Sequence, residues 1–151
     1  MLFIVYLTTI PTEYFNTAPR YATLPIYNPI MCQKILILDD DTNLLETLSI
    51  LLMDNGYEVK GLSSGEKVIE AINEFNPGLV LMDVMLADLD GLRVCREIKQ
   101  QEGMQNLPVI LISGHYDLEK ALYHDGAPND FLAKPFDLDL LLEKIKKQLA
   151  A

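Results

Sequence analysis

Residues 34–41 read KILILDDD, a run of four aliphatic residues that leads directly into three carboxylates. A short apolar run rich in Ile and Leu predicts a buried strand. Asp39 and Asp40 follow it at once, where like charges repel one another and burial is costly unless a cation balances them. The carboxylate of Asp41 is enough to cap a following helix. Asp39 and Asp40 are therefore candidate metal ligands.

Further strand-like runs follow along the chain and alternate with helical patterns. The strand candidates are YEVKGL (57–62), LVLM (79–82), PVILI (108–112) and DFLA (130–133). Apolar residues recur at helical spacing over 44–52, 68–75, 92–98, 118–122 and 138–149. Strands that are largely apolar and separated by helices indicate a parallel sheet covered on both faces. The sequence therefore predicts an α/β fold, a (βα)5 doubly wound domain whose ligands bind beyond the carboxyl ends of its strands.

Size and composition limit the possible functions. The chain has 151 residues, half of them hydrophobic, which suits one domain. Its net charge of −10 argues against direct nucleic-acid binding. Cys32 and Cys95 provide no disulfide framework or zinc site, and the apolar run 1–10 is too short to span a bilayer. We therefore expect a cytoplasmic protein with no membrane span.

The composition changes near residue 31. Four of the eight prolines and only two charged residues precede it, with no helical or alternating pattern. Prolines spaced in this way disfavour regular structure. The sequence predicts an irregular leader over residues 1–30 and a folded domain over residues 31–151. Two interpretations of the leader stay open: a disordered segment, or a stretch outside the native protein if Met31 is the true start.

Other strand ends supply residues that suit phosphoryl chemistry. Asp83 follows LVLM, Ser113 follows PVILI, and Lys134 follows DFLA. Mg2+ prefers oxygen ligands, and a carboxylate can act as a nucleophile toward phosphorus when cations stabilise the transferring oxygens. A lysine at the end of a buried strand needs an anionic partner. The expected sheet edge thus combines a nucleophile, candidate metal ligands, a hydroxyl and an ammonium.

Four motifs, KILILDDD, LVLMDVMLADLDG, PVILISG and DFLAKPF, resemble the receiver domain of bacterial two-component response regulators in order and spacing. The resemblance covers about residues 33–149. It implies a flavodoxin-like, CheY-like strand order of 2-1-3-4-5 and a signalling switch rather than an enzyme. It also implies transfer of a phosphoryl group from a sensor histidine kinase or a histidine phosphotransfer protein. Because the sequence ends at Ala151, just after Leu149, we expect a stand-alone receiver, and a longer multidomain protein is the alternative.

The resemblance assigns roles to the acidic residues. Asp83 would be the phosphoacceptor. Asp39, Asp40, Asp83 and the backbone carbonyl of Met85 would hold Mg2+, the expected cofactor.

It also assigns roles on the last two strands. Ser113 would bond a phosphoryl oxygen, and Lys134 would pair with the phosphate. Phe131 would be the aromatic switch residue, which turns inward as Ser113 moves. The Lys134–Pro135 peptide bond would be cis.

Some features depart from the family pattern or leave the output open. Ala87 replaces a usual proline, and GAPND (126–130) carries one extra residue. The expected output surface includes Tyr116, Leu118, Tyr123 and a lysine cluster at Lys144, Lys146 and Lys147. We interpret that cluster as a solvated helix end that interacts with the helix dipole. A homodimer is possible, and the alternative function is a receiver-like interaction module that works without phosphorylation.

Overall fold

The computed structural model describes residues 32–87, 89–114 and 125–151. Within them lies one five-stranded sheet of order β2-β1-β3-β4-β5, in which every neighbouring pair is parallel. The predicted doubly wound fold and its strand order are therefore confirmed. The strands are β1 Lys34–Leu38, β2 Glu58–Leu62, β3 Leu79–Asp83, β4 Val109–Ser113 and β5 Asp130–Ala133.

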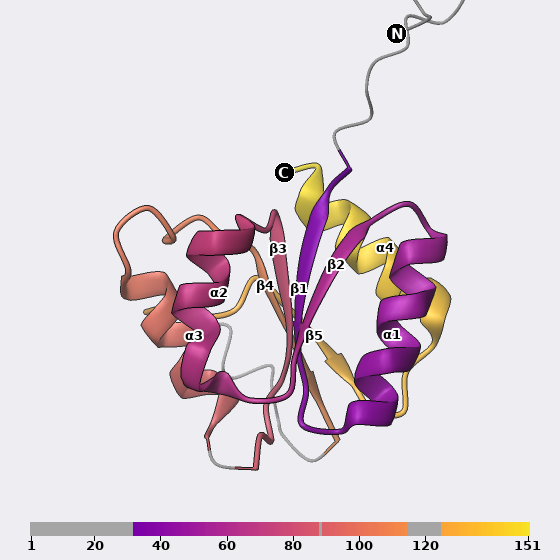
Figure 1. Ribbon diagram of the computed structural model, residues 1–151, viewed down its shortest axis with the longest axis horizontal. Coiled ribbons are helices and arrows are strands. Elements are labelled where there is room, and N and C mark those ends of the chain that lie inside the picture. The colour runs from indigo at the N-terminus through magenta and orange to yellow at the C-terminus, as the bar shows by residue number, and fades with distance from the viewer. Residues whose placement is uncertain (1–31, 88, 115–124) are drawn as a thin grey trace, which may run out of the picture. The chain divides into compact units, whose positions relative to one another are not determined.

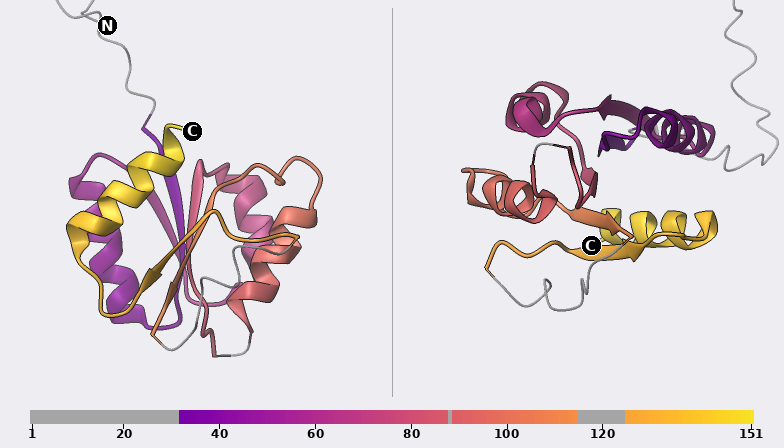
Figure 2. Two further views of the ribbon diagram at one scale, coloured as in Figure 1. Left: turned by 180° about the vertical axis from the view of Figure 1, so that it is seen from behind. Right: turned by 90° about the horizontal axis from the view of Figure 1, so that it is seen from below.

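Helices cover both faces of this sheet. They are α1 Thr42–Asp54, the short 3-10 turn η2 Gly65–Lys67, α2 Val68–Phe75, α3 Gly91–Gln100 and α4 Leu138–Leu149. The helices α2 and α3 lie on one face, and α1 and α4 lie on the other (Figures 1 and 2). The helical pattern over 118–122 and the predicted leader fall outside the described residues.

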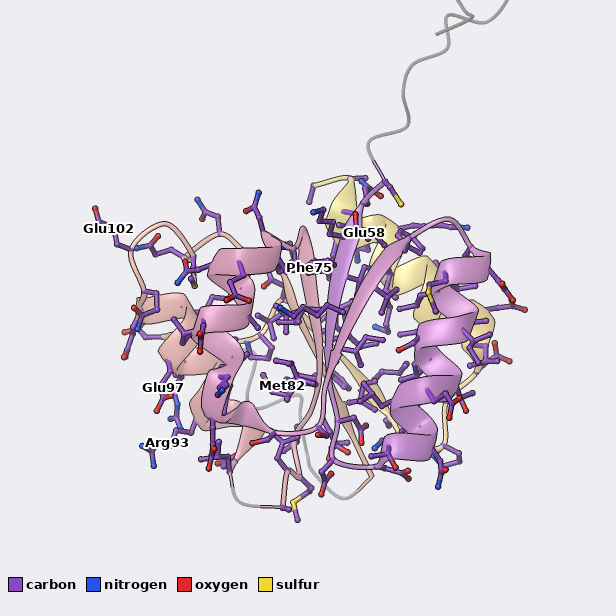
Figure 3. All side chains as sticks on the ribbon, viewed as in Figure 1. Glu58, Phe75, Met82, Arg93, Glu97 and Glu102 are labelled. Atoms are coloured by element: carbon purple, nitrogen blue, oxygen red, sulfur yellow. The ribbon has the colours of Figure 1, made fainter. Side chains whose placement is uncertain are left out.

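The core forms on both faces of β1, β3 and β4. Leu36 and Leu38 belong to the apolar cluster beneath α2 and α3, whereas Ile35 and Ile37 belong to the one beneath α1 and α4. This alternation follows from the two-residue period of a strand. Figure 3 shows Met82 of β3 on the α2 and α3 side. Burying one such side chain contributes about 1.5–3 kcal/mol, so the continuous apolar runs fix the central strands firmly.

Aspartates cap the N-termini of three of the helices. Asp41 accepts hydrogen bonds from the backbone N–H groups of Asn43 and Leu44, which confirms its predicted role as the cap of α1. Asp90 and Asp137 cap α3 and α4 in the same way. Each cap satisfies a backbone donor that the first helical turn leaves unpaired.

Some element boundaries differ from those predicted. Asp83 and Ser113 are the last residues of β3 and β4 rather than the first residues after them. Tyr57 lies before β2, not in it. The predicted cis Lys134–Pro135 bond is present. Across the described part of the chain, we find no helix with the length and apolar character needed to cross a bilayer.

The loop after β3 closes tightly against its own strand. Met85 and Asp90 form an antiparallel bridge, and the Gly91 N–H donates to the Val84 carbonyl at 2.8 Å. A Cβ atom at Gly91 would lie 2.3 Å from the Asp83 carbonyl oxygen and 2.8 Å from the Val84 Cα. Only glycine lets α3 begin this close to Asp83.

Gly91→Ala tests this close approach. Alanine normally favours a helix over glycine by about 1 kcal/mol. Here we expect the opposite sign, a loss of about 1–3 kcal/mol in the free energy of unfolding, because the methyl group would displace the Asp83 backbone. Urea denaturation measures the change. Gly114→Ala is the control, since its nearest neighbour would be the Lys134 Cβ at 3.9 Å. A Gly91→Ala protein as stable as the wild type would contradict the argument.

Candidate functional site

The candidate site lies at the carboxyl edge of the sheet, the lower edge in Figure 1. Asp39 follows β1 directly, Asp83 ends β3, Ser113 ends β4, and Lys134 follows β5. The strand register pairs Asp83 with Ile112 and Ser113 with Ala133, so these ends stand at one level. Parallel strands bring residues far apart in sequence to a common edge in this way.

Lys134 joins two of the carboxylates. Its Nζ lies 2.5 Å from Asp83 Oδ2 and 3.4 Å from Asp39 Oδ2. Asp39 is 1 % exposed and Asp83 is 7 % exposed. Buried carboxylates need such partners, because desolvation would otherwise disfavour their charged form.

The backbone orients the second oxygen of each carboxylate. Asp39 Oδ1 accepts a hydrogen bond from the Asp41 N–H at 2.9 Å, and Asp83 Oδ1 accepts one from the Met85 N–H at 2.9 Å. In both cases the donor lies two residues further along the chain, the pattern of an Asx turn. Sequence reasoning missed these two backbone donors, although an Asp at the end of a strand is a local signal for such a turn.

Negative charge is in excess at this edge. Three carboxylates lie close together, and the one ammonium beside them bonds to Asp39 and Asp83, which leaves two negative charges unbalanced. Burial, together with the negative charge of Asp83, raises the pKa of Asp39 above its usual value, and these two effects outweigh the opposing hydrogen bond from Asp41 and the charge and hydrogen bond of Lys134. Burial on its own would lower the pKa of Lys134, but the hydrogen bond to Asp83 and the charges of Asp39 and Asp83 raise it overall. Lys134 therefore stays protonated near neutral pH, while ionised Asp39 costs the folded protein free energy.

The acidic residues form a group that fits a divalent cation. One carboxylate oxygen from each of Asp39, Asp40 and Asp83 lies within 4.8 Å of the others. Asp40 is exposed, so the group faces solvent on one side. Oxygen donors with an open side suit Mg2+, which usually keeps several of its waters. The two unbalanced charges give the site an electrostatic reason to bind such an ion.

Ser113 lies at the acidic edge of the sheet, whereas Phe131 lies on the face that α2 and α3 cover. Ser113 is buried, and its carbonyl accepts a hydrogen bond from the Lys134 N–H at 2.7 Å. Phe131 pairs with Leu111 in the strand register and packs against the apolar cluster beneath α2 and α3. It sits three residues before Lys134 on β5. The structure thus brings Asp39, Asp40, Asp83, Ser113 and Lys134 to one edge, with Met85 tied to Asp83 through its N–H.

The lysines of α4 differ in their exposure and contacts. Lys144 Nζ lies 2.6 Å from Asp130 Oδ1, so the interpretation of Lys144 as part of a solvated helix end is wrong. The sequence did not reveal the pair because its partners lie on separate elements. Lys146 and Lys147 are exposed in the last turn, as expected. Tyr116, Leu118 and Tyr123 fall outside the described residues.

Comparison with known proteins gives a consistent result. The family model for the response regulator receiver domain matches residues 35–146. The chain is 31 % identical over 120 residues to the DNA-binding response regulator MtrA of Mycolicibacterium paratuberculosis. The aligned residues cover 79 % of this chain and 52 % of the relative. It is 34 % identical over 114 residues to the sensory transduction protein BceR of Halalkalibacterium halodurans, covering 75 % and 48 %. The chain thus spans about half the length of these relatives.

Solved structures with the same fold are also similar in sequence. The receiver domain of NtrX from Brucella abortus has a TM-score of 0.69 and 34 % identity, with 78 % of this chain and 98 % of that chain covered. A CheY-like receiver domain protein from Methanospirillum hungatei has a TM-score of 0.71 and 28 % identity, with coverage of 78 % and 94 %.

Asp39→Asn tests whether the excess of negative charge at this edge destabilises the folded protein. We expect the variant to be more stable than the wild type near neutral pH in a chelator, because it removes a buried charge from an acidic group. Chemical denaturation measures the free energy of unfolding. Asp125→Asn, at an exposed position, controls for the change in net charge.

The raised pKa of Asp39 predicts the direction in which the stability of the wild type changes with pH. A raised pKa means that the folded protein binds the Asp39 proton more tightly than the unfolded chain does, so wild-type stability falls as the pH rises above the usual Asp range. The advantage of Asp39→Asn should therefore shrink on acidification. An Asp39→Asn protein less stable than the wild type at neutral pH would contradict this interpretation.

Proposed function

This chain belongs to the response regulator receiver domain family, and we propose that it is a phosphorylation-dependent switch with Asp83 as the phosphoacceptor. A single observation carries the proposal: the Lys134 ammonium bridges Asp83 and Asp39 at the carboxyl edge of the sheet, with Asp40 beside them. The phosphoryl donor would be a phosphohistidine of a sensor histidine kinase or of a histidine phosphotransfer protein. The switch signals by a change of surface and is not an enzyme acting on a separate substrate.

Residues of this chain supply the groups that the phosphoryl transfer needs. An Asp83 carboxylate oxygen attacks phosphorus, forming a P–O bond while the P–N bond to the donor imidazole breaks and its electron pair leaves with nitrogen. The Met85 N–H holds the carboxylate in place during the attack. The Lys134 ammonium, already bonded to Asp83, pairs with the phosphoryl oxygens, and the Ser113 hydroxyl donates to one of them. Phe131 follows the movement of Ser113 and alters the surface.

The proposed cofactor is Mg2+. Asp39, Asp40, Asp83 and the Met85 carbonyl would hold it. When bound, Mg2+ supplies the positive charge that lets a phosphoryl group approach an acidic site. The proposal is supported by the two unbalanced negative charges and by the proximity of the three carboxylates.

The wider setting is also part of the proposal. We infer a cytoplasmic location, because histidine kinases present their phosphohistidine there. The net charge of −10 argues against direct contact between this receiver and nucleic acid. A homodimer stays a prediction.

Intact mass spectrometry after incubation with Mg2+ and phosphoramidate tests the proposal. We expect the wild type to gain one phosphoryl group and Asp83→Asn to gain none, because the neutral amide lacks the anionic carboxylate oxygen that attacks phosphorus. Asp125→Asn should gain the group as the wild type does. A folded wild type that gains nothing would favour an interaction module that works without phosphorylation, and a labelled Asp83→Asn protein would exclude Asp83 as the acceptor.

Lys134→Ala separates cation binding from switching. Removing the ammonium leaves the three carboxylates and removes a competing positive charge, so Mg2+ binding should be retained or strengthened. The phosphorylation-dependent changes elsewhere in the fold should be lost. Calorimetric titration measures the first effect, and backbone amide chemical shifts measure the second. Lys147→Ala is a matched control because Lys147 is exposed. A Lys134→Ala protein with normal phosphorylation-dependent shifts would contradict this role.

A further inference from the structure

A cleft lies between the end of α2 and the turn that follows α3. Two segments line it, residues 72–77 and 102–107, and its volume is about 330 Å³. Small-molecule pockets have volumes of roughly 300–1,000 Å³. Pro77 lies two residues before β3 begins, whereas Asp83 is the last residue of that strand. The cleft and the acidic site are therefore at opposite edges of the sheet.

The cleft has an apolar floor and a polar rim. Three buried residues form the floor, namely Ile72, Pro77 and Met104. Three exposed residues form the rim, namely Asn73, Asn76 and Glu102. Within the described part of the chain, none of the rim side chains takes part in a hydrogen bond or an ion pair. An apolar surface beside a few polar groups is the usual composition of a small-molecule site.

Hydrogen bonds hold the turn after α3 in shape. The Lys99 ammonium donates to the carbonyl oxygens of Leu107 at 2.6 Å and Gln105 at 3.4 Å. The Gly103 N–H donates to Gln105 Oε1 at 3.0 Å, and glycine suits the φ of 83° at this position. This wall of the cleft is therefore formed before any ligand binds, which lowers the conformational cost of binding.

Negative charge gathers around the cleft. Helices α2 and α3 both end beside it, and the carbonyl groups in the last turn of a helix carry a partial negative charge. Glu102, on the turn after α3 in Figure 3, adds a carboxylate at the rim. The Lys99 ammonium already bonds to three oxygens, those of Leu107, Gln105 and Asn129. No lysine, arginine or histidine is among the described residues that line the cleft.

We propose that this cleft binds a small organic cation with an apolar body, such as an amine that carries an aromatic ring or an alkyl chain. The floor removes the apolar body from water. The ammonium lies at the rim, where Glu102 and the amide oxygens of Asn73 and Asn76 accept its hydrogen bonds. Binding at this cleft needs neither Mg2+ nor phosphorylation of Asp83.

Phenethylamine tests the proposal, and phenylethanol is the matched neutral probe, because it has the same ring and chain with a hydroxyl in place of the ammonium. Backbone amide chemical shifts of the full chain near neutral pH, at constant ionic strength, measure the binding of each probe. We expect saturable shifts that are largest around Asn76 and Gly103. The Kd should be about threefold lower for phenethylamine, the effect of one exposed pair of opposite charges. The absence of saturable shifts, or equal Kd values for the two probes, would overturn the proposal.

Asn73→Trp tests the location of the site. A tryptophan at this exposed position would cover the apolar floor, so the shifts caused by phenethylamine should be lost. Asn43→Trp is the matched control, since Asn43 is an exposed asparagine on α1 and should leave binding unchanged. A folded Asn73→Trp protein that binds phenethylamine as the wild type does would overturn the assignment to this cleft.

Glu102→Gln tests the charge at the rim without adding bulk. We expect it to raise the Kd for phenethylamine about threefold and to leave the Kd for phenylethanol unchanged. Glu70→Gln removes the same charge from an exposed position on α2 that does not line the cleft, so it should match the wild type. An unchanged Kd in Glu102→Gln, or an equal rise in Glu70→Gln, would overturn the proposed selectivity for a cation.

Discussion

The pairing of two buried carboxylates with one ammonium, beside a third carboxylate that is exposed, is the constraint on which the candidate site depends. Asp39 and Asp83 are buried, and both bond to Lys134. Each also needs a backbone N–H two residues further along, which fixes the turns after β1 and β3. The site thus joins the beginning of α1, the loop before α3 and the end of β5. Its excess of negative charge gives this edge an electrostatic reason to bind a cation.

Much of this arrangement was predictable because the relevant signals are local. Continuous apolar runs predict central strands of a parallel sheet, and carboxylates at their ends predict an acidic edge. β2 is different: EVKGL is partly exposed at the edge of the sheet, so its apolar pattern is weaker and its start was placed one residue early. Asp41 has the residue type and position of a helix cap, and it is one.

Other features depend on pairings between distant elements, which sequence patterns do not contain. The Asp130–Lys144 pair joins β5 to α4, and a lysine cluster near a helix end gave no sign of it. The close approach of Gly91 to the Asp83 backbone depends on how the loop after β3 closes. Both features need three-dimensional distances. They also suggest how the acidic site is held from two sides, by the loop after β3 and by β5.

The most direct test is the free energy of unfolding of the wild type as a function of Mg2+ concentration, at constant ionic strength and near neutral pH. A ligand that binds only the folded state stabilises it progressively once its concentration exceeds the dissociation constant. We expect the free energy of unfolding to rise with Mg2+ in the wild type and to stay constant in a protein with both Asp39→Asn and Asp40→Asn. A wild-type stability that does not respond to Mg2+, or an equal response in the double variant, would contradict the assignment of this edge as a cation site.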